Sequence, residues 1–219
     1  MQRITGGRQV VRSGLAISPA EEHEFELCSA RSNENLWAMV PMPIEQKSPA
    51  VLRSMFFGRP ADVVARELLG KVLVRRINGM RMALTITETE AYLGPHDLAC
   101  HAARGRTPRT EVMFGPPGTL YVYFVYGLHW MLNIVTCPKA YPAAVLIRAA
   151  GDISGPARLT RALAIDGALN GRRADPRSGL WVEEGDRSGK VLVTPRIGVD
   201  YAGPRWSARK LRFVLARSR

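Results

Sequence analysis

The chain is poor in cysteine. Its 219 residues include three, Cys28, Cys100 and Cys137, an odd number with no close spacing. A disulfide scaffold needs an even and closely spaced set, so this class of fold is excluded. The cysteine content fits a reducing cytosol.

Long apolar runs are also missing. The longest candidate, residues 120–135, is interrupted by Gly127, His129 and Asn133. A membrane-spanning helix needs about 20 mostly apolar residues, and the N-terminal region lacks the apolar core of a secretory signal. We therefore expect no insertion into a membrane and a cytoplasmic location.

The sequence has no recognisable metal-binding motif. His96 and His101 lie close to Cys100, but the chain contains no Cys-x-x-Cys, His-Glu-x-x-His or His-x-Glu pattern of the kind that binds zinc. A histidine that donates a hydrogen bond, or one with a structural role, is the better interpretation. We expect neither a metal nor another cofactor.

Acidic residues are scarce relative to basic ones. The chain has 31 Lys and Arg against 19 Asp and Glu, a net charge of +12. Residues 1–50 hold five basic and six acidic residues, so the excess belongs to residues 51–219, with 26 basic against 13 acidic. This balance favours a polyanionic partner, usually nucleic acid. The weak periodicity of residues 1–50 predicts a disordered or weakly ordered extension before a single domain at 51–219.

The domain is predicted to be α+β, with a curved, largely antiparallel β-sheet surrounded by short helices. Asn78-Gly79 lies between two alternating runs and predicts a type I′ hairpin. Proline at a first helical position marks two short helices, from Pro60 to about residue 69 and from Pro156 to about residue 165. The expected strands are residues 71–77, 80–90, 119–126, 131–136, 143–149, 180–183, 190–193 and 211–216.

Two carboxylates lie at the end of one predicted strand. Alternation places Glu88 and Glu90 on the same face as Met82, Leu84 and Ile86, which favours partial desolvation and a raised pKa. A carboxylate of this kind can take a proton from water. The alternative is a pair of solvated strand-end charges, which is the commoner role of glutamate on a strand.

An aromatic strand follows at residues 121–126. Tyr121 and Tyr123 share a face, and Tyr126 lies where the strand ends at a glycine. Stacking rings can hold a base that has left the duplex, and a rigid side chain at a turn can fill the space it leaves. A buried core strand would show the same pattern.

A basic loop lies between these two strands. Arg104, Arg106 and Arg109 surround Thr107-Pro108, where Thr107 is the expected N-cap of a short helical turn. Three arginines in a strongly basic domain favour contact with phosphates over a merely solvated loop.

Several short motifs occur in a fixed order along the domain. They are Glu88-Thr89-Glu90-Ala91-Tyr92-Leu93-Gly94-Pro95, Thr107-Pro108-Arg109, Met113-Phe114, Pro117-Gly118-Thr119-Leu120-Tyr121-Val122-Tyr123, Tyr126-Gly127, Asn133-Ile134, Leu146-Ile147-Arg148 and Ser154-Gly155-Pro156. Together they resemble the alkyladenine (3-methyladenine) DNA glycosylase family of base-excision repair. The family commonly has a longer segment after the strand that ends near Arg148, where this chain has only residues 149–153.

The resemblance implies roles for individual residues. Glu90 would be the general base that activates water, and Arg148 would help to place that water. The pocket for the damaged base would be lined by Tyr92, His101, Tyr123 and Asn133. Side chains at the DNA surface would be Tyr126, which enters the duplex, and Leu128 beside it, with further contacts from Arg104, Arg106, Thr107, Arg109 and Gly155.

The function that the resemblance implies is that of a monofunctional DNA glycosylase. It would flip alkylated purines, with hypoxanthine or etheno-adenine as further candidates, out of double-stranded DNA and release them with water. We expect it to act as a monomer, near the nucleoid in a bacterium or in the nucleus of a eukaryote. Two alternatives remain open at this stage, a non-catalytic nucleic-acid-binding module and a nucleoside hydrolase that acts on a small molecule.

Overall fold

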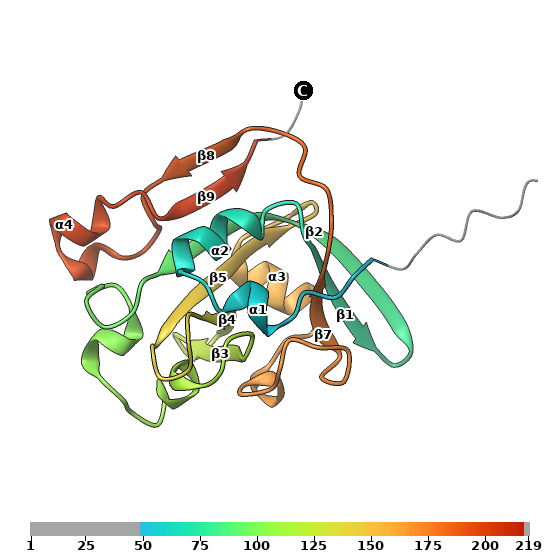
Figure 1. The fold of residues 1–219 in the computed structure, drawn as a ribbon, viewed down its shortest axis with the longest axis horizontal. Helices are drawn as coiled ribbons and strands as arrows, with labels where there is room; N and C mark the ends of the chain where they lie inside the picture. The colour runs from blue at the N-terminus through green and yellow to red at the C-terminus, as the bar shows by residue number, and fades with distance from the viewer. Residues whose placement is uncertain (1–48, 217–219) are drawn as a thin grey trace, which may run out of the picture. The chain divides into compact units, whose positions relative to one another are not determined.

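An antiparallel sheet organises the computed structural model, which describes residues 49–216 (Figure 1). The main path of the sheet runs in the order β3-β4-β5-β2-β1-β7, while β6 pairs with β5, and β9 joins β2 to β8. The strands are β1 (Val72–Ile77), β2 (Met80–Tyr92), β3 (Leu120–Val125), β4 (His129–Thr136), β5 (Ala143–Ala150), β6 (Ile153–Ser154), β7 (Leu180–Glu183), β8 (Val191–Thr194) and β9 (Arg212–Leu215). This architecture confirms the predicted α+β class.

The helices are short. The α-helices are α1 (Ser54–Phe57), α2 (Ala61–Glu67), α3 (Pro156–Ala162) and α4 (Pro204–Ser207), and the 3₁₀ helices are η1 (His101–Arg104), η2 (Glu111–Phe114), η3 (Gly167–Leu169) and η4 (Asp200–Ala202). Both predicted helices are present, although Pro60 is the residue before α2 rather than its first residue. The predicted extension at residues 1–50 lies outside the described residues except for its last two. Among residues 49–216, no helix is long and apolar enough to cross a membrane.

The β1–β2 hairpin forms where the sequence predicts it. Asn78 and Gly79 have φ angles of 49° and 78°, and a type I′ turn requires a positive φ at both central residues. The strands then pair from Ile77 with Met80 to Val72 with Thr85. Local turn chemistry is therefore sufficient to set the register of this part of the sheet.

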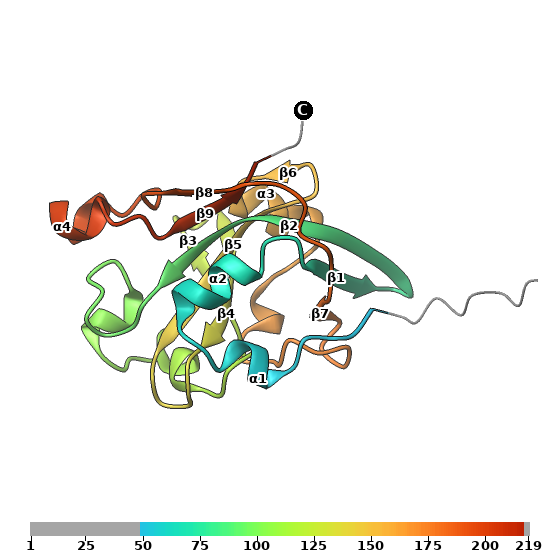
Figure 2. The same cartoon turned by 45° about the horizontal axis from the view of Figure 1, so that its top comes forward.

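The second half of β2 lies between β5 and β9 (Figure 2). Its pairing with β5 shifts on either side of Glu88, and such bulges change which way side chains point. Ile86 and Ala91 both pack into the main core although they are an odd number of residues apart, so the alternation changes phase between them. The prediction that Glu90 continues the face of Ile86 is therefore wrong, because the bulge turns Glu90 to the opposite side.

The two faces of β5 divide the molecule into a core and a cavity. Val145 and Ile147 belong to the main apolar core, to which α2 and α3 contribute Val64 and Leu159. The intervening residues of β5 line a cavity on the other face. The short connection after β5 is a tight antiparallel turn, in which Ala150 pairs with Ile153. It leads directly into α3 at the edge of the cavity.

Candidate active site

Six of the predicted site residues line one cavity of about 280 Å³, while Glu90, Arg104, Arg106, Thr107, Arg109, Leu128 and Gly155 do not. Those that line it are Tyr92, His101, Tyr123, Tyr126, Asn133 and Arg148. A larger open groove of about 600 Å³ lies beside Leu52, Phe56 and Lys71, and none of the predicted residues lines it. The smaller cavity is the better candidate, because it combines aromatic walls with a few convergent polar groups.

Glu90 lies on the cavity side of β2, in contact with the lining residues Tyr92 and Arg148, but it is completely buried and does not itself line the cavity. Its Oε1 accepts a hydrogen bond from the backbone N–H of Ile197 at 2.8 Å, and its Oε2 accepts one from the Tyr92 hydroxyl at 3.0 Å. Nη1 of Arg148 lies 3.3 Å from Oε1. Burial raises the pKa of Glu90 above its ordinary value despite the opposing charge of Arg148 and these hydrogen bonds. The alternative of a solvated strand-end charge does not hold for this residue.

Glu88, two residues earlier, has a different environment. Its Oε1 accepts hydrogen bonds from Nε of both Arg148 and Arg212, each at 2.7 Å. Burial alone would raise its pKa, but the two arginines outweigh burial and lower it. Glu88 is therefore an ionised anchor that holds Arg148 beside Glu90. Arg148 is itself the extra residue where the register of β5 shifts, which directs its side chain towards both carboxylates.

Tyrosine rings form the walls of the cavity. Tyr121 and Tyr123 project from β3 with ring centroids 5.2 Å apart, and Tyr92 projects from the end of β2. Tyr121 also packs in a small core cluster with Met113 and Ala144. The interpretation as a core strand is confirmed for Tyr121. The rings of Tyr121 and Tyr123 also line the cavity, and their contact with a base stays a prediction.

His101 stands at the cavity wall on η1. Its Nδ1 lies 3.0 Å from the Tyr121 hydroxyl, and its ring meets the Tyr123 ring edge-on, with centroids 4.7 Å apart. Burial and the nearby charges of Arg109 and Arg104 lower the pKa of His101 to about 4. The imidazole is therefore neutral at physiological pH and can offer a hydrogen bond without adding positive charge to the cavity.

Asn133 comes from β4 and is 3% exposed. Its Nδ2 donates to the carbonyl of Tyr121 at 3.2 Å, which fixes the amide against the neighbouring strand. Because the side chain lines the cavity and is fixed in place, it can act as a steric limit on what enters.

The rim of the cavity carries exposed apolar side chains. Tyr126 is 87% exposed and Leu128 is 71% exposed, on either side of Gly127 at the tip of the β3–β4 hairpin. Tyr126 has a φ of 53°, a left-handed conformation that is uncommon for a non-glycine residue. Gly155 precedes α3 with a φ of 96° and has open space where a Cβ would lie, so a partner can approach the backbone there. Exposed rings at a hairpin tip are suited to insertion into a partner.

The basic loop is built around a capped turn. Thr107 and Thr110 bond reciprocally, each accepting from the backbone N–H of the other. Thr107 therefore caps the turn at residues 107–110, as predicted, whereas the 3₁₀ helix η2 that follows has Thr110 as its N-cap. Arg109 lies over the Tyr123 ring at 5.0 Å, and Arg106 pairs with Glu111 at 3.0 Å. Arg104, Arg106 and Arg109 are exposed. Their contact with phosphates stays a prediction.

Comparison with known proteins agrees with this geometry. The sequence profile of the methylpurine-DNA glycosylase family matches residues 55–154 and 151–219. The chain belongs to this family. It is therefore a DNA glycosylase, a hydrolase of N-glycosidic bonds, and its substrate is DNA.

Individual relatives support the same assignment. A protein of Methanocella arvoryzae is 47% identical over 173 residues, an alignment that covers 70% of this chain and 86% of the relative. Proteins of Anaeromyxobacter dehalogenans and Myxococcus xanthus are 48% and 49% identical, covering 75% and 74% of this chain and 83% and 88% of the relatives. All three carry the name "Putative 3-methyladenine DNA glycosylase".

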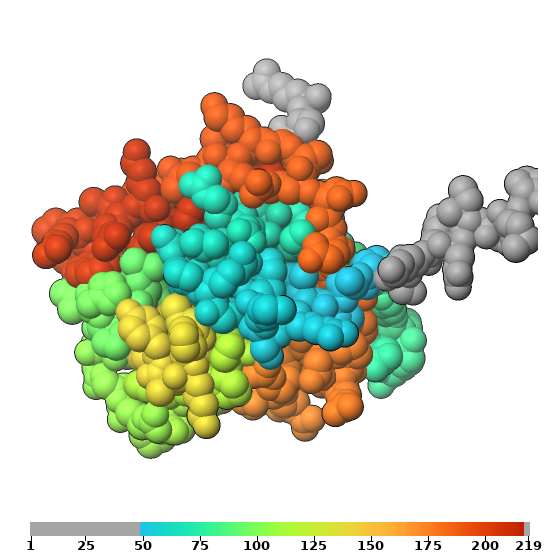
Figure 3. Space-filling view, viewed as in Figure 1, coloured from blue at the N-terminus to red at the C-terminus, as the bar shows by residue number. Residues whose placement is uncertain are grey.

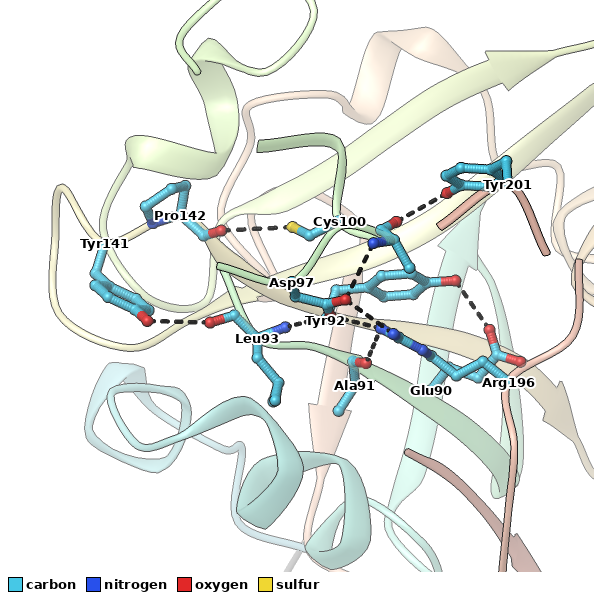
Figure 4. A network of polar contacts seen from close by, with 11 residues as sticks. Glu90, Ala91, Tyr92, Leu93, Asp97, Cys100, Tyr141, Pro142, Arg196 and Tyr201 are labelled. Atoms are coloured by element: carbon cyan, nitrogen blue, oxygen red, sulfur yellow. Dashed lines mark hydrogen bonds and ion pairs between the residues drawn. The ribbon is translucent and has the colours of Figure 1, made fainter. Parts of the chain in front are cut away.

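Several residues of the candidate site have no local sequence signal. Arg212 on β9 holds Glu88, Ile197 supplies the N–H that binds Glu90, and Tyr201 lines the cavity. Asp97 and Arg196 form a buried ion pair behind Tyr92 (Figure 4). All but Asp97 belong to the last 25 residues of the chain, where the sequence indicates only short strands and turns.

A metal site is not evident in residues 49–216. No group of three His, Cys, Asp or Glu side chains in that part of the chain could hold a metal ion. Cys100 lines the cavity, and burial raises the pKa of its thiol to about 11, so it is a neutral wall group at physiological pH.

Proposed function

We propose that this glycosylase releases alkylated purines, of the 3-methyladenine type, from double-stranded DNA by direct hydrolysis. The observation that carries the proposal is the contact of Glu90, a buried carboxylate with a raised pKa, with Tyr92 and Arg148, two residues that line an aromatic cavity. Groups whose pKa is shifted by burial in a cleft are characteristic of catalytic sites. The names of the relatives agree with this substrate.

Glu90 acts as the general base. Its carboxylate takes a proton from a water molecule while the water oxygen forms a bond to C1′ of the flipped nucleotide. The bond between C1′ and the base nitrogen breaks, and its electron pair leaves with the base. The sugar passes through an oxocarbenium-like state, which the nearby carboxylate charge stabilises. Arg148, held by Glu88 at 2.7 Å, helps to place the water.

The cavity selects for damaged purines. An N3- or N7-alkylated purine is cationic and leaves as a neutral base, so it needs less help than a normal purine. Tyr92 and Tyr123 attract such a cation through their π faces, and His101 donates a hydrogen bond. Asn133 excludes the exocyclic amine of guanine from the space it occupies. Hypoxanthine and etheno-adenine are flat, poorly paired bases that are also candidates for this cavity.

The exposed side chains beside the cavity contact the DNA duplex. Tyr126 enters the space that the flipped nucleotide leaves, with Leu128 beside it in the minor groove. Arg104, Arg106 and Arg109 contact phosphates, supported by Thr107 and by the open backbone at Gly155. No lysine is among the described residues that line the cavity, so the proposal includes no covalent Schiff base with the sugar and no lyase activity. The enzyme is also proposed to act as a monomer.

A panel of damaged duplexes tests the proposal. Oligonucleotide duplexes that each contain 7-methylguanine, hypoxanthine, etheno-adenine or undamaged adenine are incubated with the enzyme, then treated with alkali to cleave abasic sites. We expect strand scission at the alkylated purine only after alkali. Scission before alkali would show lyase activity, and salt-sensitive binding without scission on any lesion would favour a non-catalytic binding module.

A Tyr126→Ala variant separates DNA glycosylase activity from hydrolysis of free nucleosides. We expect weaker scission of duplex substrates, because the vacated space is no longer filled. Release of bases from free nucleosides at a rate that the substitution leaves unchanged would instead support a nucleoside hydrolase.

A further inference from the structure

A buried ion pair lies directly behind the catalytic carboxylate. Nη1 and Nη2 of Arg196 contact the two carboxylate oxygens of Asp97 at 2.6 and 2.9 Å, and both side chains are completely buried. Neither residue lines the cavity, so neither touches a bound base. The role of this pair must be exerted through its neighbours.

The pair joins two parts of the chain that are distant in sequence, residues 91–99 and the segment after β8 (Figure 4). Nη1 of Arg196 also donates to the carbonyl of Ala91, at the end of β2, at 2.9 Å. Asp97 accepts hydrogen bonds from the backbone N–H groups of Leu93 and Ala99, each at 3.1 Å. The end of β2, the loop before His101 and the segment after β8 are thus tied to two side chains.

Each of these segments supplies a working part of the site. The residue after Arg196 is Ile197, whose N–H binds Glu90 at 2.8 Å. The guanidinium of Arg196 lies 4.9 Å from the centroid of the Tyr92 ring, and the Tyr92 hydroxyl binds the other oxygen of Glu90. Both hydrogen bonds to the carboxylate are therefore controlled from the position of Arg196.

We infer that Arg196, held by Asp97, is a positioning residue that orients Glu90 for proton abstraction through the N–H of Ile197 and the ring of Tyr92. The inference rests on the proposed role of Glu90 as the base. It gives the C-terminal segment a part in the chemistry, although that segment contributes no group that reacts.

Energetics favour a positioning role over a purely stabilising one. Burying an ion pair costs desolvation that its attraction roughly offsets, so apolar residues of similar size are often as stable. Nε of Arg196 is buried without a partner in the described structure, which adds to the cost. A bidentate pair nevertheless fixes both direction and distance. What the pair contributes over an apolar contact is the precise placement of the groups around it.

A neighbouring apolar cluster also joins the loop before His101 to the C-terminal segment. Ala99, from the loop before His101, packs with Val199, Ala202 and Trp206 of the C-terminal segment. Figure 3 shows these segments in contact at the surface, with the red C-terminal part against the green loop. The Tyr201 hydroxyl also donates to the carbonyl of Ala99 at 2.8 Å. Loss of the ion pair is therefore expected to disturb the site without detaching the segment.

The test compares Arg196→Met, Arg196→Lys and Asp97→Asn with the wild-type enzyme. Arg81→Met is the matched control, because Arg81, on β2, also forms an ion pair with a buried carboxylate, that of Glu183. Arg81 is at the opposite end of β2 from Glu90. The melting temperature of every variant shows whether it is folded.

The first measurement is the single-turnover rate of base release from a 7-methylguanine duplex, with enzyme in excess. We expect Arg196→Met to lower this rate about 10²-fold, the size of effect that follows from a small misplacement of a catalytic group. Arg196→Lys, which keeps the charge, should recover part of the loss. Affinity for a duplex that carries an abasic-site analogue should stay at the wild-type value, because Arg196 is buried.

The second measurement is the pH dependence of the same rate. The groups that act electrostatically on Glu90 are Glu88 and Tyr92 on β2, Tyr123 on β3, Arg148 on β5 and Arg196 after β8. Loss of the Arg196 charge and of the aligned Ile197 N–H removes stabilisation of the carboxylate. The acidic limb of the profile should therefore move to higher pH in Arg196→Met, and should not move in Arg81→Met. Asp97→Asn keeps the charge of Arg196 and removes a negative one, so this variant tests the positioning role through its rate.

The outcomes separate the two proposals. Wild-type rates in both Arg196→Met and Asp97→Asn, together with an unmoved acidic limb in Arg196→Met and only lower melting temperatures, would overturn the positioning role and leave Glu90 as the base. If Arg196→Met does not fold, the Asp97→Asn and Arg196→Lys measurements decide by the same criteria. A wild-type rate in Glu90→Gln protein would overturn the proposed base, and the positioning role with it.

Discussion

The two ends of β2 differ in the contacts that determine their structure. Residues Met80 to Thr85 pair with β1 in a hairpin, and their side chains are exposed or half-buried. Residues Glu88 to Ala91 are buried and lie between β5 and β9. The first end is built from contacts within the hairpin, whereas the second depends on strands far along the chain.

The difference lies in where the partners come from. At the first end, the two positive φ angles of Asn78 and Gly79 suffice to set the pairing. At the second end, Glu88 is held by arginines 60 and 124 positions away in sequence. The turn residues therefore determine the pairing of the hairpin, whereas contacts between distant segments determine the environment of the two glutamates.

Within the second end, two glutamates acquire opposite properties. Arg148 and Arg212 lower the pKa of Glu88, while burial raises that of Glu90. Two like groups whose environments push their pKa values apart are a common way to divide roles in an active site. Five predictions test this division and the contrast between the two ends of β2, from the largest expected effect to the smallest.

Replacing Glu90 should have the largest effect on activity. We expect Glu90→Gln to lower the single-turnover rate by roughly 10³-fold, the usual contribution of a general base. The same substitution should raise the melting temperature at neutral pH, because a carboxyl with a raised pKa destabilises the fold when it is ionised. Rate and thermal unfolding are measured on the same preparation. A variant with a lower melting temperature than the wild type would contradict the raised pKa of Glu90, and one with the wild-type rate would contradict its role as the base.

Replacing Glu88 should affect activity less and stability in the opposite direction. Glu88→Gln leaves Arg148 and Arg212 without their shared carboxylate, so we expect the rate to fall about tenfold through misplacement of Arg148. The free energy of unfolding should fall by about 2 kcal/mol, as expected when hydrogen bonds to a charged group are weakened. Denaturant unfolding at neutral pH measures this change. Equal rate losses in Glu88→Gln and Glu90→Gln would remove the distinction between anchor and base.

The pH dependence of the rate should report Glu90 alone on its acidic side. The base must be ionised, so the rate should rise with pH through a pKa above 4.5. His101, with a pKa of about 4, is already neutral between about pH 5 and pH 8 and should add no second limb there. A His101→Gln variant with an unchanged acidic limb is the expected result. A limb that disappears in this variant would assign it to His101 instead.

The stability of the fold responds to pH through the same two residues with opposite signs. Glu88, with a lowered pKa, stabilises the fold at neutral pH, and this contribution is lost as the pH falls through that lowered value. Glu90, with a raised pKa, contributes stability at low pH that is lost as the pH rises through the raised value. Melting temperatures of the two Gln variants from acidic to neutral pH should therefore diverge as the pH rises.

A change at the first end of β2 should have the smallest effect on activity. Gly79→Ala places a Cβ at a φ of 78°, which costs about 1 kcal/mol and lowers the melting temperature by about 2–4 °C. The rate should equal that of the wild-type enzyme, since Gly79 lies far along the strand from Glu90. A large loss of activity in folded Gly79→Ala protein would show that the two ends of β2 are coupled.

Much of the fold was accessible from local pattern. The strands at 120–125 and 143–150 lie within one residue of their predicted bounds. The helix that begins at Pro156 starts at its predicted residue but ends at Ala162, about three residues early. The bulge around Glu88 was not accessible, because alternation gives no sign of where a register shifts. Thr89 accordingly faces α2, where its hydroxyl binds the carbonyl of Ala65, while Glu90 faces the cavity.

The residues of the candidate site also fall into those that the sequence indicated and those that it did not. Motifs and resemblance pointed to Glu90, Tyr92, His101, Tyr123 and Arg148, and these residues lie together in or beside the cavity. They did not point to Arg196 or Arg212, since arginines are common in a chain this basic and nothing local distinguishes these two. Their partners are carboxylates on β2 and in the loop that follows it.

The sequence by itself determined the basic charge, the antiparallel hairpins, the aromatic strand and the motif that carries Glu90, because each depends on neighbours within a few residues. Only the tertiary structure decided which of two adjacent glutamates would be raised in pKa and which lowered. That outcome depends on burial, on charges contributed by β5 and β9, and on a hydrogen bond from the segment after β8. Electrostatic environment is a property of positions in space, so it appears only when distant segments come together.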